Sequence, residues 1–385
     1  MKKTTCIASL MVCLSMGQAG ALAQNIRIDM NKTYPEKTIS LQKVADVKYI
    51  PLETTDEVLF NGVVTHLSAE GIAGFNKKEG DILLFDGTGK AIASFNHTGQ
   101  GPNEYNKIYH LDVDWKQKEV YVQDNFRQKI RIYALDGSHL RTIDLQETMQ
   151  QGDLYNFSDT HLIYYAQPKS KPVTPYEPVT LLTKKEASKV TLPFTKTDDN
   201  LVKATGGPFG DMKMSAKNVN LLCKKGDEVY VNEVTADVIY RVESNHALTP
   251  VVERTPSYQD ASGQDFFLML TGANARYYFF KRQQALLEFQ GNAATDTKST
   301  YVAYDRKEKQ LLNPTFTNED YPSQDIPMSK LLQCAGSANR CYLQLEAFKL
   351  KEALAEGKLK GTLKSIAEKL DEEDNPVLMV VEFKK

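Results

Sequence analysis

The sequence contains the stretch I-A-G-F-N-K-K-E-G-D-I-L-L-F-D-G-T-G-K-A-I-A-S-F at residues 72–95. At an offset of 48 it reads V-Y-V-Q-D-N-F-R-Q-K-I-R-I-Y-A-L-D-G-S-H-L-R-T-I, residues 120–143. The two copies align without a gap, so that Ile82 falls on Ile130 and Gly89 on Gly137. Each copy has short runs rich in apolar residues, separated by polar turns, which predicts three strands of an antiparallel sheet. The aligned glycines supply the positive φ that a tight hairpin needs.

A repeat of about 40–50 residues that folds as a small antiparallel sheet is typical of a β-propeller. Such a sheet cannot bury both faces alone, and a closed ring lets its neighbours cover them. A third copy begins with E-V-Y-V at residues 228–231, and divergent copies are expected at residues 161–194 and 276–304, the last with a strand at 285–289. The alternatives are an open solenoid or a sandwich of unrelated hairpins. The mature length divided by 48 gives between seven and eight units, but insertions and C-terminal helices use part of it.

The two ends of the chain carry complementary single strands. A strand with Val47 and Tyr49 has no hairpin partner nearby, and V-L-M-V-V-E-F at residues 377–383 has the composition of a buried strand. We expect these strands to complete one blade and close the ring. A helix is predicted from the spacing of Leu359, Leu363, Ile366 and Leu370. A turn of helix is expected before it, at residues 348–355. The predicted fold class is therefore an all-β propeller with a short C-terminal helical insertion.

The N-terminus has the pattern of a secretory leader. Two lysines precede an apolar run that ends in Ala21-Leu22-Ala23, a small-x-small cleavage pattern, so residues 1–23 are expected to be removed as a signal peptide. The run is interrupted and short for a stable membrane span. Neither Cys6 nor Cys13 follows a small residue of the kind that lipoprotein attachment requires. We expect a periplasmic or secreted protein with one domain at residues 24–385 and no transmembrane segment after cleavage.

Charge and cysteine content narrow the expected partners. The formal net charge is −2, and the leader holds two lysines and no acids, so the mature chain is more negative. Nucleic acid is not an expected partner, because binding it needs clustered positive charge. A monomer is expected.

Cys334 and Cys341 are candidates for a disulfide that closes a small loop, the alternative being two buried free thiols. Cys223 follows apolar residues and is expected in the core.

The chain lacks the usual catalytic signatures, such as G-x-S-x-G, H-E-x-x-H, C-x-x-C and the phosphate-binding G-x-x-x-x-G-K-[ST]. No cofactor is predicted. The candidate ligand-binding residues, at the axis or on one face, are His97, His110, Asp112, Asp114 and Trp115. Asp112 and Asp114 alternate on one strand and therefore point the same way, which would suit acid–base work or a divalent cation at the axis. The alternative is that they accept hydrogen bonds from turn amides.

The turn that joins the two repeats reads G-Q-G-P-N-E-Y, and its signature residues are Gly99, Gly101, Pro102, Glu104 and Tyr105. Pro102 fixes φ and the glycines permit a tight reversal. Glu104 is expected to accept hydrogen bonds from turn amides and Tyr105 to pack on the next blade. We favour this structural role over ligand binding.

This turn resembles the G-x-G-P-G-E-Y signature of a six-bladed β-propeller family of Bacteroidetes, distantly NHL-like, exported and mostly uncharacterised. I-P-L-E-T (residues 50–54), A-D-V-I-Y (236–240) and D-N-P-V-L (374–378) resemble further elements of that family. Asn103 stands where the family has glycine. The resemblance implies six blades and export, but no catalytic residues. We expect a non-catalytic protein that binds a glycan, a peptide or an envelope protein on one face or at the axial pocket. The alternative is a periplasmic hydrolase or lyase with a polar or metal-containing axial site.

Overall fold

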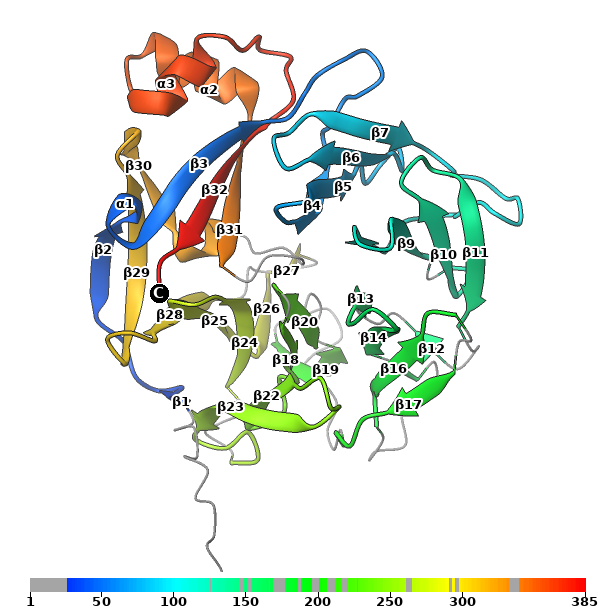
Figure 1. Cartoon of the computed structure of the whole chain (residues 1–385). Coiled ribbons are helices and arrows are strands. Elements are labelled where there is room, and N and C mark those ends of the chain that lie inside the picture. Colours follow the sequence, from blue (N-terminus) through cyan, green and yellow to red (C-terminus); the bar gives the residue numbers. More distant parts are fainter. Residues whose placement is uncertain are drawn as a thin grey trace, which may run out of the picture.

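In the computed structural model, six small β-sheets stand around a common axis as the blades of a β-propeller (Figure 1). The structure describes residues 26–124, 126–145, 149–150, 154–165, 167–168, 177–185, 188–195, 201–205, 212–215, 221–226, 228–260, 265–290, 293–294, 298–331 and 339–385. The propeller prediction is confirmed, with six blades and not the seven or eight given by dividing the length. The difference is chain used outside the blades, in insertions and helices.

Blades 1 to 3 each contain four antiparallel strands that follow one another along the chain from the axis outward. Blade 1 has β4 (Val63–Leu67), β5 (Gly71–Phe75), β6 (Ile82–Asp86) and β7 (Ala91–Phe95). Blade 2 has β8 (His110–Asp114), β9 (Glu119–Asp124), β10 (Lys129–Ala134) and β11 (His139–Asp144). Blade 3 has β13 (Leu154–Asn156), β14 (His161–Tyr165), β16 (Val179–Thr183) and β17 (Lys189–Thr191), beside the short pair β12 (Met149–Gln150) and β15 (Gln167–Pro168).

Blades 4 and 5 have the same four-stranded plan with additions. Blade 4 has β20 (Leu222–Lys225), β21 (Glu228–Val231), β22 (Val238–Val242) and β23 (Leu248–Thr255). Blade 5 has β24 (Phe266–Ala273), β25 (Tyr277–Gln284), β28 (Ser299–Asp305) and β29 (Gln310–Asn318), with β30 (Tyr321–Pro327) paired to β29. The 3-10 turn η2 (Met328–Lys330) follows. The repeats expected at residues 161–194 and 228–253 are thus confirmed as parts of blades 3 and 4.

Neighbouring blades bury each other's faces. On β6, Ile82 and Leu84 lie in a core shared with blade 2, whereas Leu83 and Phe85 lie in a core shared with blade 6. Successive side chains of a strand point to opposite faces, and here both faces are covered, so β6 is apolar throughout. In the hairpins that follow, Gly89 and Gly137 have φ of +92° and +86°, as their alignment predicts.

Blade 6 closes the ring from both ends of the chain. It contains β31 (Arg340–Leu345), β32 (Val377–Phe383) and, as its outer strand, β3 (Ala45–Pro51) from the N-terminal side. Val47 pairs with Val381 and Tyr49 with Met379, so the predicted closure is confirmed. The helices α2 (Ala347–Ala355) and α3 (Gly361–Ala367) lie between β31 and β32 in the chain, and Leu350 and Leu363 bury against blade 6.

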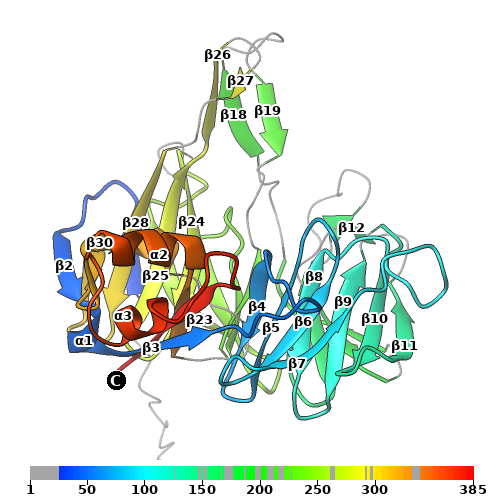
Figure 2. The same cartoon turned by 90° about the horizontal axis from the view of Figure 1, so that it is seen from above.

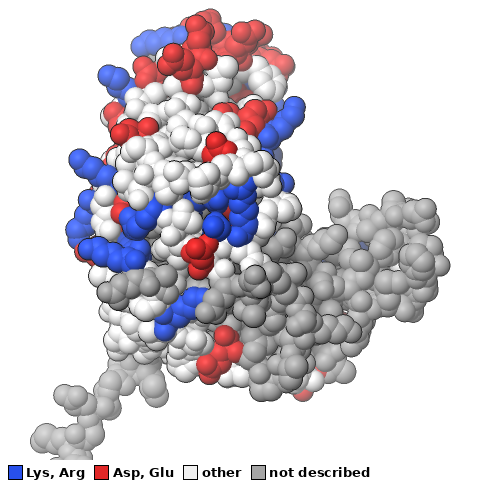
Figure 3. All heavy atoms as spheres, turned by 90° about the vertical axis from the view of Figure 1, so that its right-hand side faces the viewer, with Lys and Arg blue, Asp and Glu red and all other residues white. Residues whose placement is uncertain are grey.

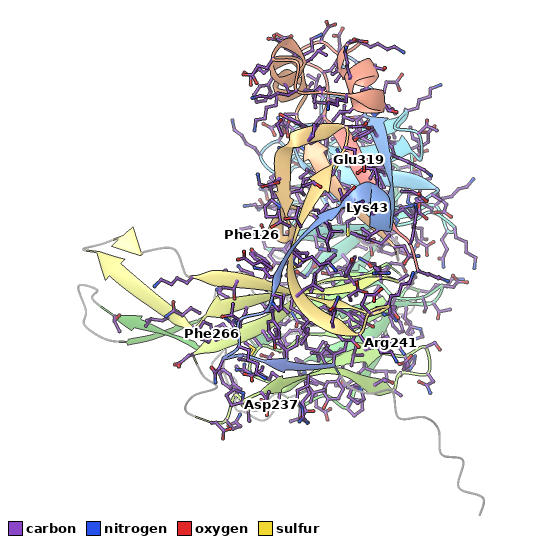
Figure 4. The ribbon with its side chains drawn as sticks, turned by 90° about the vertical axis from the view of Figure 1, so that its left-hand side faces the viewer. Lys43, Phe126, Asp237, Arg241, Phe266 and Glu319 are labelled. Atoms are coloured by element: carbon purple, nitrogen blue, oxygen red, sulfur yellow. The ribbon has the colours of Figure 1, made fainter. Side chains whose placement is uncertain are left out.

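The segment before β3 runs along the outside of the ring. We call residues 26–51 the belt. It contains β1 (Ile26–Asp29), which pairs with β23, and β2 (Glu36–Ser40), which pairs with β29. The short helix α1 (Leu41–Val44) then leads into β3. Figure 4 shows this side of the molecule, with Lys43 of α1 near Glu319, whose carboxylate accepts a hydrogen bond from Ser40 Oγ at 2.9 Å.

A separate four-stranded sheet, which we call the arm, projects from one face of the ring (Figure 2). It combines β18 (Leu201–Thr205) and β19 (Met212–Ser215), inserted between blades 3 and 4, with β26 (Leu286–Gln290) and β27 (Ala293–Ala294), inserted in blade 5. The prediction that residues 285–289 form a blade strand is therefore wrong in part. This segment has strand composition, but it pairs in parallel with β18 and not with β25.

Candidate functional site

The innermost strands bring polar side chains from four blades together around Asp112. His66 Nδ1 lies 2.9 Å from Asp112 Oδ1, and the backbone N–H of Asn156 donates to Asp112 Oδ2 at 2.8 Å. Lys224 Nζ lies 3.6 Å from the same Oδ2. These partners come from blades 1, 3 and 4, whereas Asp112 is on β8 of blade 2. Only the axis is shared by so many blades. We call His66, His110, Asp112, Asn156 and Lys224 the axial cluster.

The axial cluster fixes the charge of Asp112. Burial alone would raise the pKa of its carboxyl group, but Lys224 and the hydrogen bond from His66 outweigh burial and hold the pKa well below its ordinary value. An ionised carboxylate only accepts hydrogen bonds, so the shared proton belongs to His66 Nδ1. In the neutral ring, Nε2 of His66 is then an acceptor. His66 is thereby held in one tautomer and one orientation.

His110 lies two residues before Asp112 on β8, so both side chains leave the strand on the same face. Its ring meets Tyr155 of blade 3 edge-to-face, with 4.8 Å between centroids. Burial lowers the pKa of His110 to about 4, because the effect of burial and of Lys224 exceeds the opposing attraction of Asp112. The imidazole is therefore neutral at pH 7.

Several buried polar atoms of the cluster make no hydrogen bond to any residue that the structure describes. They are Nε2 of His66, Nε2 of His110 and Oδ1 of Asn156. A buried polar atom without a partner costs about 1–3 kcal/mol. Three such atoms around one carboxylate form an arrangement that a bound molecule or water would complete.

Asp114 and Trp115 are engaged in packing at the far end of β8. Asp114 accepts hydrogen bonds from Lys184 Nζ at 2.7 Å and from the turn amide of Gln117 at 3.0 Å. Burial raises its pKa, but the Lys184 contact prevails and the net shift is downward. The Trp115 ring packs so closely on blade 1 that a Cβ at Gly71 would lie 2.4 Å from it. Both side chains border the axial cluster. A hydrogen bond from the Asn156 side chain helps to lower the pKa of Asp114, and the Trp115 ring meets the His66 ring edge-to-face, with 6.3 Å between centroids.

His97 lies away from the axial cluster, between the outer strands of blades 1 and 2. Its Nε2 is 2.7 Å from the carbonyl oxygen of Gly137, and its ring stacks on Tyr133 at 5.0 Å. The expectation that His97 or His110 stands beside Asp112 thus applies to His110 alone. Position 97 follows β7, the outer strand of blade 1, and the chain returns to the axis only at β8.

The signature turn is held together by its own residues. Gly101 N–H donates to the Glu104 carboxylate at 2.6 Å, and a Cβ at Gly99 would lie 2.0 Å from that carboxylate, so a larger residue would displace the Glu104 side chain. Tyr105 OH donates to the Gly80 carbonyl at 2.7 Å. Pro102 and Asn103 form the tip of the turn, and the φ of Asn103 is not positive, so the position does not require the family's glycine. The geometry is that of a joint between blades 1 and 2.

Comparison with known proteins places the chain in a family. The profile described as "Domain of unknown function (DUF4934)" matches residues 25–382. The chain belongs to the DUF4934 family. Two solved structures are similar to this DUF4934 protein. A candidate exported protein of Bacteroides fragilis has 14% identity and a TM-score of 0.64, over 94% of this chain and 99% of that one. A DUF4221 member from Bacteroides vulgatus has 9% identity and a TM-score of 0.51, over 89% and 98%.

At such low identity these two structures support the fold of the DUF4934 protein and nothing more specific. A search of curated proteins finds no match. The resemblance to a six-bladed family found in Bacteroidetes is confirmed at the level of the fold. Within the described ranges, no helix is long and apolar enough to cross a membrane.

Three members of the axial cluster, and one residue that holds the signature turn in place, were not predicted from the sequence. His66, Asn156 and Lys224 lie in strands without a recognisable motif, and only ring closure brings them to Asp112. Arg127 was missed as well, although it lies in the second repeat. Its guanidinium donates to the carbonyl oxygens of Gly99, Gly101 and Glu104 at 2.9–3.2 Å. The only sequence signal for this role was the presence of a positively charged residue in the polar turn after β9.

The predicted metal and the predicted disulfide both remain predictions. Among the residues that the structure describes, no group of three or more His, Cys, Asp or Glu side chains could hold a metal ion. A divalent cation at the axis stays a prediction. Cys341 is buried in the core near α2, whereas Cys334 lies outside the described residues, so their pairing stays a prediction too. Cys223 is buried, as expected.

Proposed function

We propose that this DUF4934 protein is an exported binding protein that holds a neutral ligand, rich in hydroxyl or amide groups, at the axial cluster. The observation that carries the proposal is the set of buried polar atoms around Asp112 without partners among the described residues: His66 Nε2, His110 Nε2 and Asn156 Oδ1. Hydroxyl and amide groups donate and accept hydrogen bonds in the small number of directed contacts that binding sites use. Neutral glycans and peptides both carry such groups.

Charge balance supports a neutral ligand. The carboxylate of Asp112 is balanced by Lys224, and that of Asp114 by Lys184. With His110 uncharged at pH 7, the group formed by Asp112, Lys224 and His110 has no excess charge to attract an anion or a cation. A charged ligand would have to lose its hydration without gaining a counter-ion, which is costly in a buried site.

Binding is tested by titrating the purified mature protein, in a calorimeter, with neutral oligosaccharides, uncharged peptides and acidic counterparts of both. We expect saturable binding of a neutral compound, at least tenfold weaker in His66→Phe. The matched control is His161→Phe, because His161 lies at the start of β14, outside the axial cluster and outside the outer strands, and should leave the affinity unchanged. Preference for the acidic ligands, or equal affinity in wild type and His66→Phe, would refute the proposal.

One observation favours a second candidate, a hydrolase or lyase. Asp112 orients His66, and Nε2 of His66 has no hydrogen-bond partner among the described residues. A general base has this arrangement when a carboxylate stabilises its imidazolium form. Mass spectrometry of ligands recovered after long incubation separates the two functions. Products that form with wild type and not with His66→Phe would indicate catalysis. Unchanged ligand would favour binding alone.

A further inference from the structure

The belt adds an outer strand to three successive blades. Blades 4 and 5 already have four strands of their own, so β1 and β2 are fifth strands, and both run parallel to the strand they join. Blade 6 has only two strands from its own part of the chain and needs β3 as its third. Outer edges of this propeller therefore accept an added parallel strand, as blades 4 and 5 show.

The fifth strand of blade 4, β1, has side chains that point alternately into the core and outward. Ile26 and Ile28 are buried in a core with Val252, and Val251 packs against the same core. Between them, Arg27 points outward and reaches Glu253 at 3.1 Å. The backbone of the strand pairs with residues 252–255. An extended segment with an apolar residue at every second position is sufficient for this contact.

Blades 1, 2 and 3 end on their own outer strands, β7, β11 and β17, which no other strand of the described chain covers. The second residue of each strand is a large apolar side chain that is about half exposed: Ile92 at 47%, Leu140 at 48% and Val190 at 47%. Ile92 and Leu140 are the extra residues of β-bulges. Val251 is the extra residue of the bulge in β23, and β1 pairs with the residues directly after it, 252–255. A bulge is therefore compatible with strand addition here.

Along the edge of blade 1, the protection normal for an edge strand is limited: the Glu53 carboxylate accepts a hydrogen bond from the N–H of Ala91, the first residue of β7, at 2.8 Å. Proteins block such edges with charged side chains or proline. β7 reads A-I-A-S-F and has neither. On β11, the charges of Arg141 and Asp144 are paired within blade 2, with Glu119 and Lys129. Figure 3 shows this side of the ring, where charges of both signs are interspersed with broad uncharged regions.

We propose that the outer edges of blades 1 and 2 bind an extended segment of a partner protein, which adds to β7 or β11 as a parallel strand in the way β1 adds to β23. Main-chain hydrogen bonds supply the affinity in this mode of recognition, and alternate side chains supply the specificity. The segment should carry an apolar residue at every second position to cover Ile92 or Leu140. This proposal is independent of the axial cluster.

The test is a selection of random 12-residue peptides displayed on phage, using the full-length mature protein, with counter-selection against the double variant Ile92→Asp/Leu140→Asp. We expect enriched peptides with alternating apolar residues. Synthetic copies should bind at least tenfold more weakly to the double variant and slow hydrogen exchange of the amides at 91–95 or 139–144. The conservative pair Ile92→Val/Leu140→Ile should retain binding. Thermal unfolding checks that the exposed substitutions leave the fold intact.

Three outcomes would overturn the proposal. The first is that no selected peptide distinguishes wild type from the double variant. The second is that bound peptides leave exchange at both outer strands unchanged. The third is that the wild-type chain itself dimerises in sedimentation experiments and the double variant does not, which would assign these edges to a second copy.

Discussion

Replacing His110 with glutamine should remove a loss of stability that the wild-type protein suffers between pH 6.5 and pH 4. Burial lowers the pKa of His110 from 6.5 to about 4 in the folded chain. Above pH 6.5 the ring is neutral in both states and has no effect. Between the two values the unfolded chain binds a proton that the folded chain does not, so stability falls as the pH falls. Below pH 4 both states are protonated and the loss stops.

The size of the effect follows from the shift. Lowering the pKa from 6.5 to about 4 corresponds to about 3–3.5 kcal/mol, since each pKa unit is worth about 1.4 kcal/mol. Asp112 acts in a different window. Its folded pKa is depressed, so its stabilisation is present above the unfolded value of 3.8 and is lost as the pH falls below it. The histidine effect can therefore be measured without interference from this carboxylate.

The assay is urea unfolding of wild type and His110→Gln at half-unit steps from pH 7.5 to pH 4. The pKa values of His139 and His161 are also lowered by burial, so wild type and variant should share part of the decline. We expect the difference between the two proteins to grow by about 3 kcal/mol in favour of the variant as the pH falls from 6.5 to 4. Parallel profiles over this range would refute the claim that His110 is neutral in the folded protein.

Four further predictions concern other parts of the chain. Lys224→Met should destabilise the protein by about 3–5 kcal/mol, because it leaves Asp112 buried without its counter-ion; urea unfolding should show a smaller loss when Asp112→Asn is added. Arg127→Ala removes four hydrogen bonds to the signature turn, and calorimetric unfolding should show a loss of about 2–4 kcal/mol; an unchanged Tm would contradict its role. Ile28→Ala should cost about 2–5 kcal/mol by opening a cavity under the belt, whereas Ile92→Ala on the uncovered edge should change stability by less than about 1 kcal/mol in the same measurement. Mass spectrometry of protein secreted by a bacterial host should find Gln24 at the N-terminus, and an intact leader on the exported protein would contradict the predicted cleavage.

The repeat unit was predictable because its signals are local. These signals are the alternating apolar residues, the glycine aligned in the second turn of the two best copies, and the common repeat length. Each of them arises within one sheet. The pairing of β3 with β32 was also foreseeable, since two single strands at opposite ends of a repeat protein can be satisfied only by each other. The number of blades followed from the family resemblance and not from the chain length, because residues in the arm and in the helices use up length and have the same composition as residues in the blades.

The candidate site was predictable only in part. Asp112 and His110 alternate on one strand, and sequence alone places them on the same face. Their partners, His66 and Lys224, are 46 and 112 positions away from Asp112 in the chain, and nothing in their local sequence marks them. His97 was a reasonable candidate by proximity in sequence, yet it is separated from His110 by the full width of a blade.

Local sequence patterns specify the sheets, their strand order and the closure of the ring, because these depend on neighbouring residues and on the shortage of strands at each end. The identity of the polar side chains that meet at the axis, and of the outer edges that the belt covers, emerges from the three-dimensional arrangement of the blades. Both depend on how blades far apart in the chain are turned toward a common centre. That arrangement is set by the packing of the blades against one another, which the residues of any single repeat do not encode.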